Sequence, residues 1–90
     1  LLCVLLSLAA CGGPDPAASL AAAQKAEAVE DYPLMRAKAL EVLDARGEDP
    51  AALALLARAQ LMLGDGDGAQ ATLQRWRAAG GSGAAITRML

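Results

Sequence analysis

The chain has 90 residues, enough for one small domain or for part of a larger one. Its apolar fraction of 56 % comes from alanine and leucine, because the chain has one tyrosine, one tryptophan and no phenylalanine. Eight basic and ten acidic residues are scattered along it and histidine is absent, which argues against nucleic-acid binding, metal sites and enzymatic chemistry.

Residues 1–10, LLCVLLSLAA, form an uncharged apolar run. The run has about the length of a signal-peptide core, and about half the roughly 20 residues that a membrane-spanning helix needs. We therefore predict a signal peptide over residues 1–10. Its positively charged start would precede Leu1, and the chain stops within the amphipathic segment AAITRML, so we expect an N-terminal fragment of a longer protein.

The end of the apolar run resembles the lipobox of bacterial lipoproteins, with Leu8, Ala9, Ala10 and Cys11 in the family's order. The resemblance implies cleavage between Ala10 and Cys11 and transfer of diacylglycerol to the Cys11 thiol. Small residues suit a peptidase that grips an extended chain. The alternative is a buried apolar helix that ends in an ordinary core cysteine.

The lipobox resemblance also predicts how the mature chain is held. Residues 11–15 would be the lipidated cysteine and a short tether, and Cys3 would leave with the signal peptide, so no disulfide is expected. In the family, an aspartate after the lipidated cysteine often retains the protein in the inner membrane. Gly12 stands at that position, so we expect the periplasmic face of the outer membrane.

The rest of the chain repeats with a fixed period. A shift of 34 aligns DPAASLAAAQKAEAVEDY (15–32) with DPAALALLARAQLMLGDG (49–66), and such a period is typical of helix-turn-helix arrays. Aspartate followed by proline suits a helix start. No segment alternates as a strand does, so we predict an all-α fold with helices over 16–29, 33–46, 50–63 and 68–79, and a fifth that starts near 84.

The repeat resembles the tetratricopeptide repeat (TPR) family, whose small residue at position 8 falls on Ala23 and Ala57. The resemblance covers residues 15–90 and implies a right-handed α-solenoid of stacked antiparallel helix hairpins. Repeat 1 would span 16–48, repeat 2 would span 49–82, and 83–90 would begin a third. The chain departs from the family's pattern at four positions, and the alternative is an unrelated helical bundle. Those positions are Ser19, Met35, Gln60 and Trp76.

The TPR resemblance implies a groove that binds a protein or peptide partner, lined by the first helix of each repeat. Two of its residues, Arg58 and Arg88, would suit a carboxylate of the partner. An Ala57 side chain would instead pack against the neighbouring helix. Carried over position by position, the groove residues are Leu20, Gln24, Glu27, Ala28, Ala54, Arg58, Leu61, Met62 and Arg88.

Together these features predict a membrane-anchored scaffold in the bacterial cell envelope that serves pilus assembly, secretion or exopolysaccharide export. No catalytic residue, metal, cofactor, nucleic acid or small-molecule substrate is expected. Two alternatives remain, namely an envelope enzyme whose catalytic domain lies beyond residue 90, and a structural lipoprotein. The segment DGDG at 65–68 begins like a calcium loop but lacks the later ligands, so we interpret it as a turn with a helix cap.

Overall fold

The computed structural model describes residues 15–81, which form four helices and no strand. The predicted all-α fold is thus confirmed for this part of the chain. The predicted signal peptide, Cys11, Arg88 and the predicted fifth helix lie outside the described residues. The helices are α2 (Pro16–Ala28), α3 (Tyr32–Arg46), α4 (Pro50–Met62) and α5 (Gly66–Ala78).

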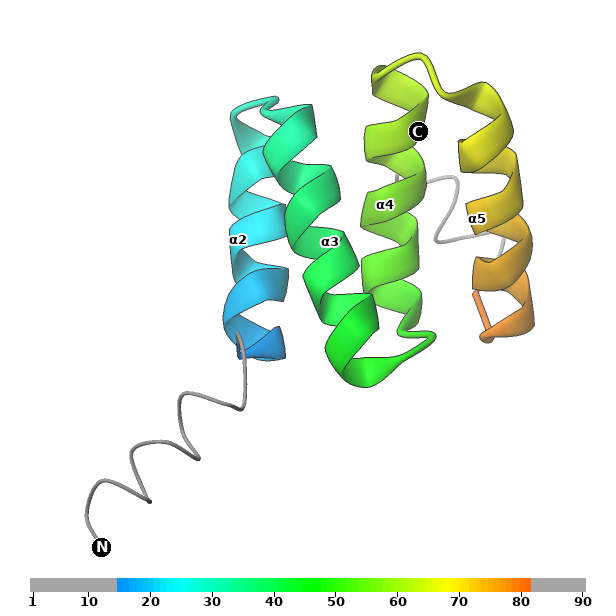
Figure 1. The fold of residues 1–90 in the computed structure, drawn as a ribbon, viewed down its shortest axis with the longest axis horizontal. Helices are drawn as coiled ribbons and strands as arrows, with labels where there is room; N and C mark the ends of the chain where they lie inside the picture. Colours follow the sequence, from blue (N-terminus) through cyan, green and yellow to red (C-terminus); the bar gives the residue numbers. More distant parts are fainter. Residues whose placement is uncertain (1–14, 82–90) are drawn as a thin grey trace, which may run out of the picture.

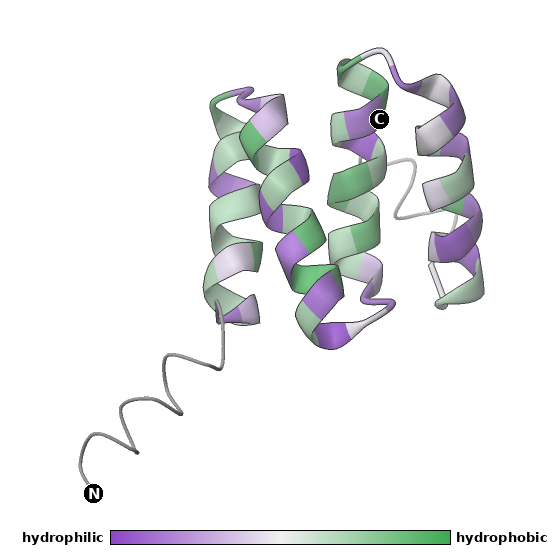
Figure 2. Ribbon diagram, in the orientation of Figure 1, coloured by the Kyte–Doolittle hydropathy of each residue, from purple (hydrophilic) through white to green (hydrophobic). Residues whose placement is uncertain are grey.

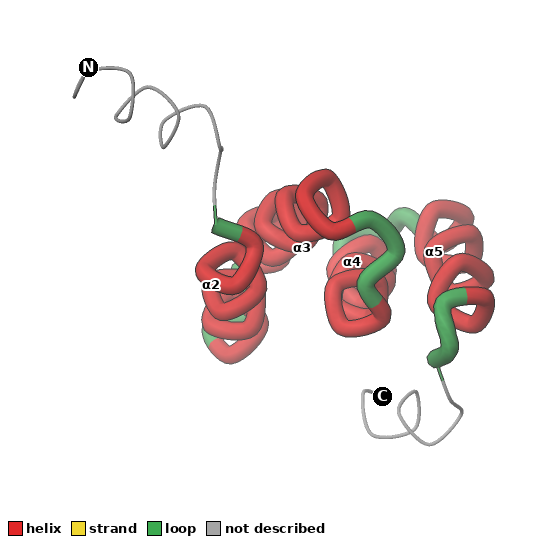
Figure 3. Tube along the Cα trace, turned by 90° about the horizontal axis from the view of Figure 1, so that it is seen from below, coloured by secondary structure: helices red, strands yellow, loops and turns green. Residues whose placement is uncertain are grey.

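Successive helices run antiparallel to one another (Figure 1). Each helix contacts the next one in the chain, and α2 also contacts α4. Seen along the helices, α2 and α4 lie on one side of the array and α3 lies on the other (Figure 3). The first helices of the two repeat units are therefore neighbours in space.

The helix boundaries agree with the sequence prediction to within one residue for α2, α3 and α4. The prediction for α5 is wrong by two residues at its start, because the helix begins at Gly66 rather than at 68. Asp65, not Asp67, is the cap, since the Asp65 carboxylate accepts a hydrogen bond from the Gly68 amide at 2.9 Å. Asp67 lies in the first turn of the helix instead.

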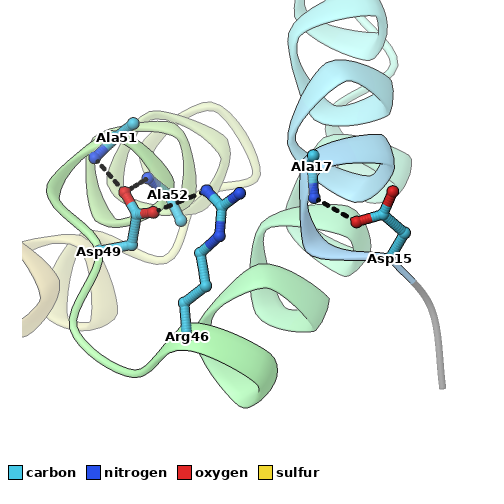
Figure 4. Close-up of polar contacts among 6 residues, drawn as sticks. All are labelled: Asp15, Ala17, Arg46, Asp49, Ala51 and Ala52. Atoms are coloured by element: carbon cyan, nitrogen blue, oxygen red, sulfur yellow. Dashed lines mark hydrogen bonds and ion pairs between the residues drawn. The ribbon is translucent and has the colours of Figure 1, made fainter. Parts of the chain in front are cut away.

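Every described helix is capped by an aspartate that accepts hydrogen bonds from the first free amides, which have no partner within the helix. Asp15 and Asp49 act as the Asp-Pro pattern predicts, and Figure 4 shows both caps. Asp31 and Asp65 cap α3 and α5. The two members of each pair are separated by one sequence period, so the helix starts follow the repeat.

The ends of α2 and α4 share a Schellman motif, in which a residue with positive φ reverses the chain. In α2, Asp31 N donates to Ala26 O at 2.8 Å and Glu30 N donates to Glu27 O at 3.1 Å. The equivalent bonds at the end of α4 have the same lengths, with Gly64 in the place of Glu30. The φ angles are 59° at Glu30 and 85° at Gly64, so one motif has the favoured glycine and the other a glutamate.

Replacing Glu30 by glycine is expected to stabilise the fold by about 0.5–1 kcal/mol, because the left-handed conformation strains a residue with a Cβ atom. The reverse change, Gly64→Glu, should destabilise it by a similar amount. An added Cβ at Gly64 meets no atom within 4 Å, so the cost comes from the backbone alone. Urea unfolding of both variants measures the change in the free energy of unfolding. If Glu30→Gly destabilised the fold, the left-handed backbone at Glu30 would not be strained.

Asp49 has the richest set of cap contacts. Its carboxylate accepts hydrogen bonds from Ala51 N at 2.9 Å and Ala52 N at 3.4 Å, and it pairs with Arg46 Nη1 at 3.1 Å (Figure 4). Partial burial raises the pKa of Asp49, but the hydrogen bonds from Arg46 and the two amides outweigh burial and hold the pKa below its ordinary value. The folded state therefore stabilises the charged form of the Asp49 carboxylate.

Two glutamates also have lowered pKa values. The Ser19 hydroxyl donates to Glu41 at 2.8 Å and lowers its pKa, and Arg75 lowers that of Glu48 through contacts of 2.6 and 2.9 Å. The Glu48 contact ties the α3–α4 turn to α5. Groups whose pKa is lower in the folded state stabilise it above their unfolded pKa, and this stabilisation is lost as the pH falls.

We therefore expect the free energy of unfolding to fall once the pH drops below the ordinary values, 4.5 for glutamate and 3.8 for aspartate. Asp49→Asn should weaken this pH dependence while it keeps the cap, because asparagine caps as well as aspartate. Asp49→Ala should cost about 0.5–2 kcal/mol at neutral pH. Thermal melts between neutral pH and pH 3 measure the pH dependence of stability and the cost of Asp49→Ala. If the Asp49→Asn variant lost as much stability in acid as the unchanged chain, the lowered pKa of Asp49 would not contribute to the pH dependence.

The core is centred on α4, which is the most apolar helix in Figure 2 and contacts all three others. Leu53 and Leu56 are its fully buried large side chains. Met35 and Val42 of α3 complete the centre, and Trp76 of α5 closes the other side. In contrast, α2 buries only Ser19, Ala23 and Ala26, so it adds little large apolar surface.

The four departures from the TPR pattern are all accommodated inside the helix array. Ser19 is buried with its hydroxyl bonded to Glu41, and Gln60 accepts a hydrogen bond from buried Thr72 at 2.6 Å. Buried polar groups are tolerated when they are paired in this way. Met35 and Trp76 are large apolar side chains in the core.

Candidate partner-binding surface

The predicted groove residues come from two neighbouring helices, α2 and α4. None of those that the structure describes is buried. Gln24, Ala28, Leu61 and Met62 are exposed, and the others are partly buried. Arg88 lies outside the described residues, so its place beside Arg58 stays a prediction.

Glu27 and Arg58 meet across the two helices. Arg58 Nε lies 3.0 Å from Glu27 Oε2, and both side chains are about one-third exposed. Sequence reasoning placed both residues in the groove without pairing them, because the sequence period does not show how α2 and α4 are offset. Any anionic group of a partner would have to compete with Glu27 for Arg58. The expectation that Arg58 suits a carboxylate of the partner stays a prediction.

The apolar groove residues fall into two kinds. Leu20 and Ala54, which occupy the same position in the two repeat units, pack partly against the core. Leu61 and Met62 are about half exposed at the end of α4, next to the exposed Leu63. This end of the surface is therefore apolar, whereas the centre carries the Glu27–Arg58 pair.

Sequence reasoning missed a surface pocket between α3 and the end of α4. The pocket has a volume of about 190 Å³ and is lined by Arg36, Gln60, Leu63 and Asp65. The available signal was the run Leu61, Met62 and Leu63 at the end of α4, because three successive apolar residues in and just after a helix cannot all face one core.

Across residues 15–81, no helix is long and apolar enough to cross a membrane. The same region holds no cluster of three or more cysteine, aspartate or glutamate side chains that would suit a metal ion. The DGDG segment holds a helix cap, as its interpretation as a turn predicts, although the cap is Asp65 and the three residues after it already belong to the first turn of α5. The predicted cleavage and lipidation residues, Ala10 and Cys11, lie outside the described residues.

No protein-family model, no curated protein and no solved structure matches the chain. Its resemblance to TPR lipoproteins therefore rests on the residues themselves. The geometry that bears on function is the pair α2 and α4, with Glu27 and Arg58 in contact between them.

Proposed function

We propose that the chain is the anchored, N-terminal part of a TPR-like scaffold that binds a protein partner in the bacterial cell envelope. The observation that carries this proposal is the lateral contact of α2 with α4, two helices with the same Asp-Pro start and the same C-terminal motif. Arrays of such units present an extended surface on one side, formed by the first helix of each unit.

The composition of that surface supports binding rather than catalysis. Its side chains include exposed apolar residues and an ion pair, and the chain has no histidine that could act as a base or a metal ligand. Exposed apolar side chains that lie beside one another mark interaction sites on soluble surfaces. A protein or peptide is therefore the proposed ligand.

The proposed anchor is a lipid on Cys11, supported by the sequence Leu8-Ala9-Ala10-Cys11 after an apolar run. Two or more acyl chains hold a protein stably on a membrane. The periplasmic face of the outer membrane is the proposed location, and Gly12 supports it. Glycine residues 12 and 13 would join the anchor to α2 through a short tether.

Replacing Cys11 by serine in the full-length protein is expected to leave an uncleaved precursor without lipid. A serine hydroxyl cannot form the thioether that the modification requires. Incorporation of labelled palmitate, followed on a gel, measures lipidation. The mass of the product shows whether the precursor has been cleaved. A Cys3→Ser variant is the matched control and should be processed normally. Equal labelling of the Cys11→Ser variant would exclude the anchor.

Site-specific photo-crosslinking in intact cells tests the binding surface of the full-length protein. A photoreactive amino acid at Gln24 or Ala54 should give adducts with the same partner, because α2 and α4 contribute to one surface. Ala37 and Asp44, exposed on α3, are the control positions and should give none. Adducts formed equally from the α3 positions, or no adduct from α2 and α4, would overturn the proposed groove.

A further inference from the structure

One end of the helix array carries an exposed apolar patch. The α2–α3 and α4–α5 turns lie at the same end (Figure 1), and large apolar side chains around both turns are exposed. Val29 reaches 73 % exposure at the end of α2. We call this surface the tip patch, and it comprises Val29, Leu34, Leu61, Met62 and Leu63.

The tip patch has a hollow as well as exposed side chains. The pocket of about 190 Å³ brings Arg36 of α3 together with Gln60, Leu63 and Asp65 at the end of α4, so it bridges the two hairpins. Small-molecule pockets usually exceed about 300 Å³, and this one is smaller. It suits the side chain of a protein partner better than a free ligand.

The charges around the tip patch are predominantly acidic. Four carboxylates lie in or next to the two turns, and none of them takes part in the ion pairs of residues 15–81. Two helices start and two end here, so the helix dipoles largely offset one another. The carboxylates are Glu30, Asp31, Asp65 and Asp67, and the nearby cations are Lys25 and Arg36.

The opposite end of the array also carries carboxylates, but the tip holds five of the six exposed large apolar side chains of residues 15–81. There Arg46 pairs with Asp49 and Arg75 pairs with Glu48 at the opposite end, while Asp15 and Asp44 take no part in the ion pairs of residues 15–81. The tip is therefore the end where exposed large apolar side chains lie beside carboxylates that take no part in the ion pairs of residues 15–81. Complementary charge steers binding and excludes partners of the same sign.

We propose that the tip patch binds a basic amphipathic helix of a partner protein. The apolar face of that helix covers Leu61, Met62 and Leu63 and places one side chain in the pocket, while its lysines or arginines face the four carboxylates. This inference rests on the proposed function in that the ligand is a protein, and it extends the groove to the tip, because Leu61 and Met62 belong to both surfaces. The patch is small, so the affinity should be about micromolar.

Binding of a synthetic helical peptide to the full chain tests the proposal. The probe has leucine on one face and lysine on the other, and the comparison peptide has glutamate in place of lysine. Fluorescence anisotropy should give the lysine peptide a Kd lower by about tenfold or more, with a smaller difference at high salt. Equal affinity for the two peptides would overturn the charge complementarity.

Variants locate the binding site. Met62→Ser with Leu63→Ser should weaken binding of the lysine peptide about tenfold, and Asp67→Lys should also weaken it. Asp67 is not a helix cap, so its replacement keeps the Asp65 cap, and a lysine in the first turn of α5 should cost at most about 1 kcal/mol. Leu40→Ser is the matched control, because Leu40 is 43 % exposed and Leu63 is 44 % exposed. An equal effect of Leu40→Ser would overturn the tip site.

Three other outcomes would also reject the tip site. In the first, the chain self-associates and the Met62 and Leu63 changes abolish the self-association. In the second, the chain binds lipid vesicles and the same changes abolish that binding. In the third, the changes leave binding of the lysine peptide unchanged. Crosslinks through Gln24 and Ala54 do not depend on the tip. Their presence without a tip effect would leave the proposed function standing, whereas their absence would reject the proposed function itself.

Discussion

Replacing Leu53 by alanine is expected to cost about 2–5 kcal/mol, a large part of the stability of a domain of this size. Leu53 is 0 % exposed and lies in α4, the helix that contacts every other described helix. The change removes buried apolar atoms and leaves a cavity that rigid neighbours fill only in part. Loss of cooperative unfolding, or a chain unfolded at 37 °C, is the expected result.

Leu40→Ala is the control for this experiment, because it removes the same atoms from an exposed site of a neighbouring helix. Surface changes of this kind usually alter stability by about 0.5 kcal/mol or less. Circular dichroism melts of both variants give the comparison. Similar melting temperatures for the two variants would show that α4 is not the centre of the core.

Replacing Gly81 by alanine is expected to destabilise the fold by about 1–3 kcal/mol, the usual cost of overpacking. A Cβ at this position would overlap the indole ring of Trp76, which is buried. The same glycine donates its amide to Trp76 O at 2.9 Å and so closes the turn after α5. The ring and the turn cannot both keep their places once a methyl group is added.

Two further variants separate overpacking from a general effect of losing glycine. Gly66→Ala adds a methyl group that meets no atom within 4 Å at the start of α5, so its effect should be neutral or slightly stabilising. Trp76→Leu should partly restore the stability lost in Gly81→Ala, because the smaller leucine side chain leaves room for the added methyl group. Tryptophan fluorescence cannot follow this double variant, so circular dichroism is the measurement. Additive costs of the two changes would contradict a direct clash.

Much of the helix layout follows from the sequence, since local chemistry decides where helices start and stop. The Asp-Pro pairs at 15–16 and 49–50 mark two starts, and the shift between them gives the length of each unit. The start of α5 was misplaced because DGDG offers two aspartates at which a helix can begin. Only the bond from Gly68 N to Asp65 shows which one caps it.

The side-chain pairs between helices could not be predicted in the same way. Whether Glu27 reaches Arg58 depends on how far α2 is shifted along α4, and no local propensity sets that shift. Ser19 looked like a defect of the first unit, yet it is paired with Glu41 of the next helix. Such contacts between residues far apart in sequence decide the electrostatics of the candidate surface.

The thin packing of α2 has a consequence for how the chain opens. Its buried face consists of Ser19, Ala23 and Ala26, whereas α4 buries six residues, three of them leucines. Regions with few large apolar contacts open at lower free-energy cost than the global transition. Backbone amides of α2 should therefore exchange with deuterium before those of α4, and we expect α2 to be the first described helix to open.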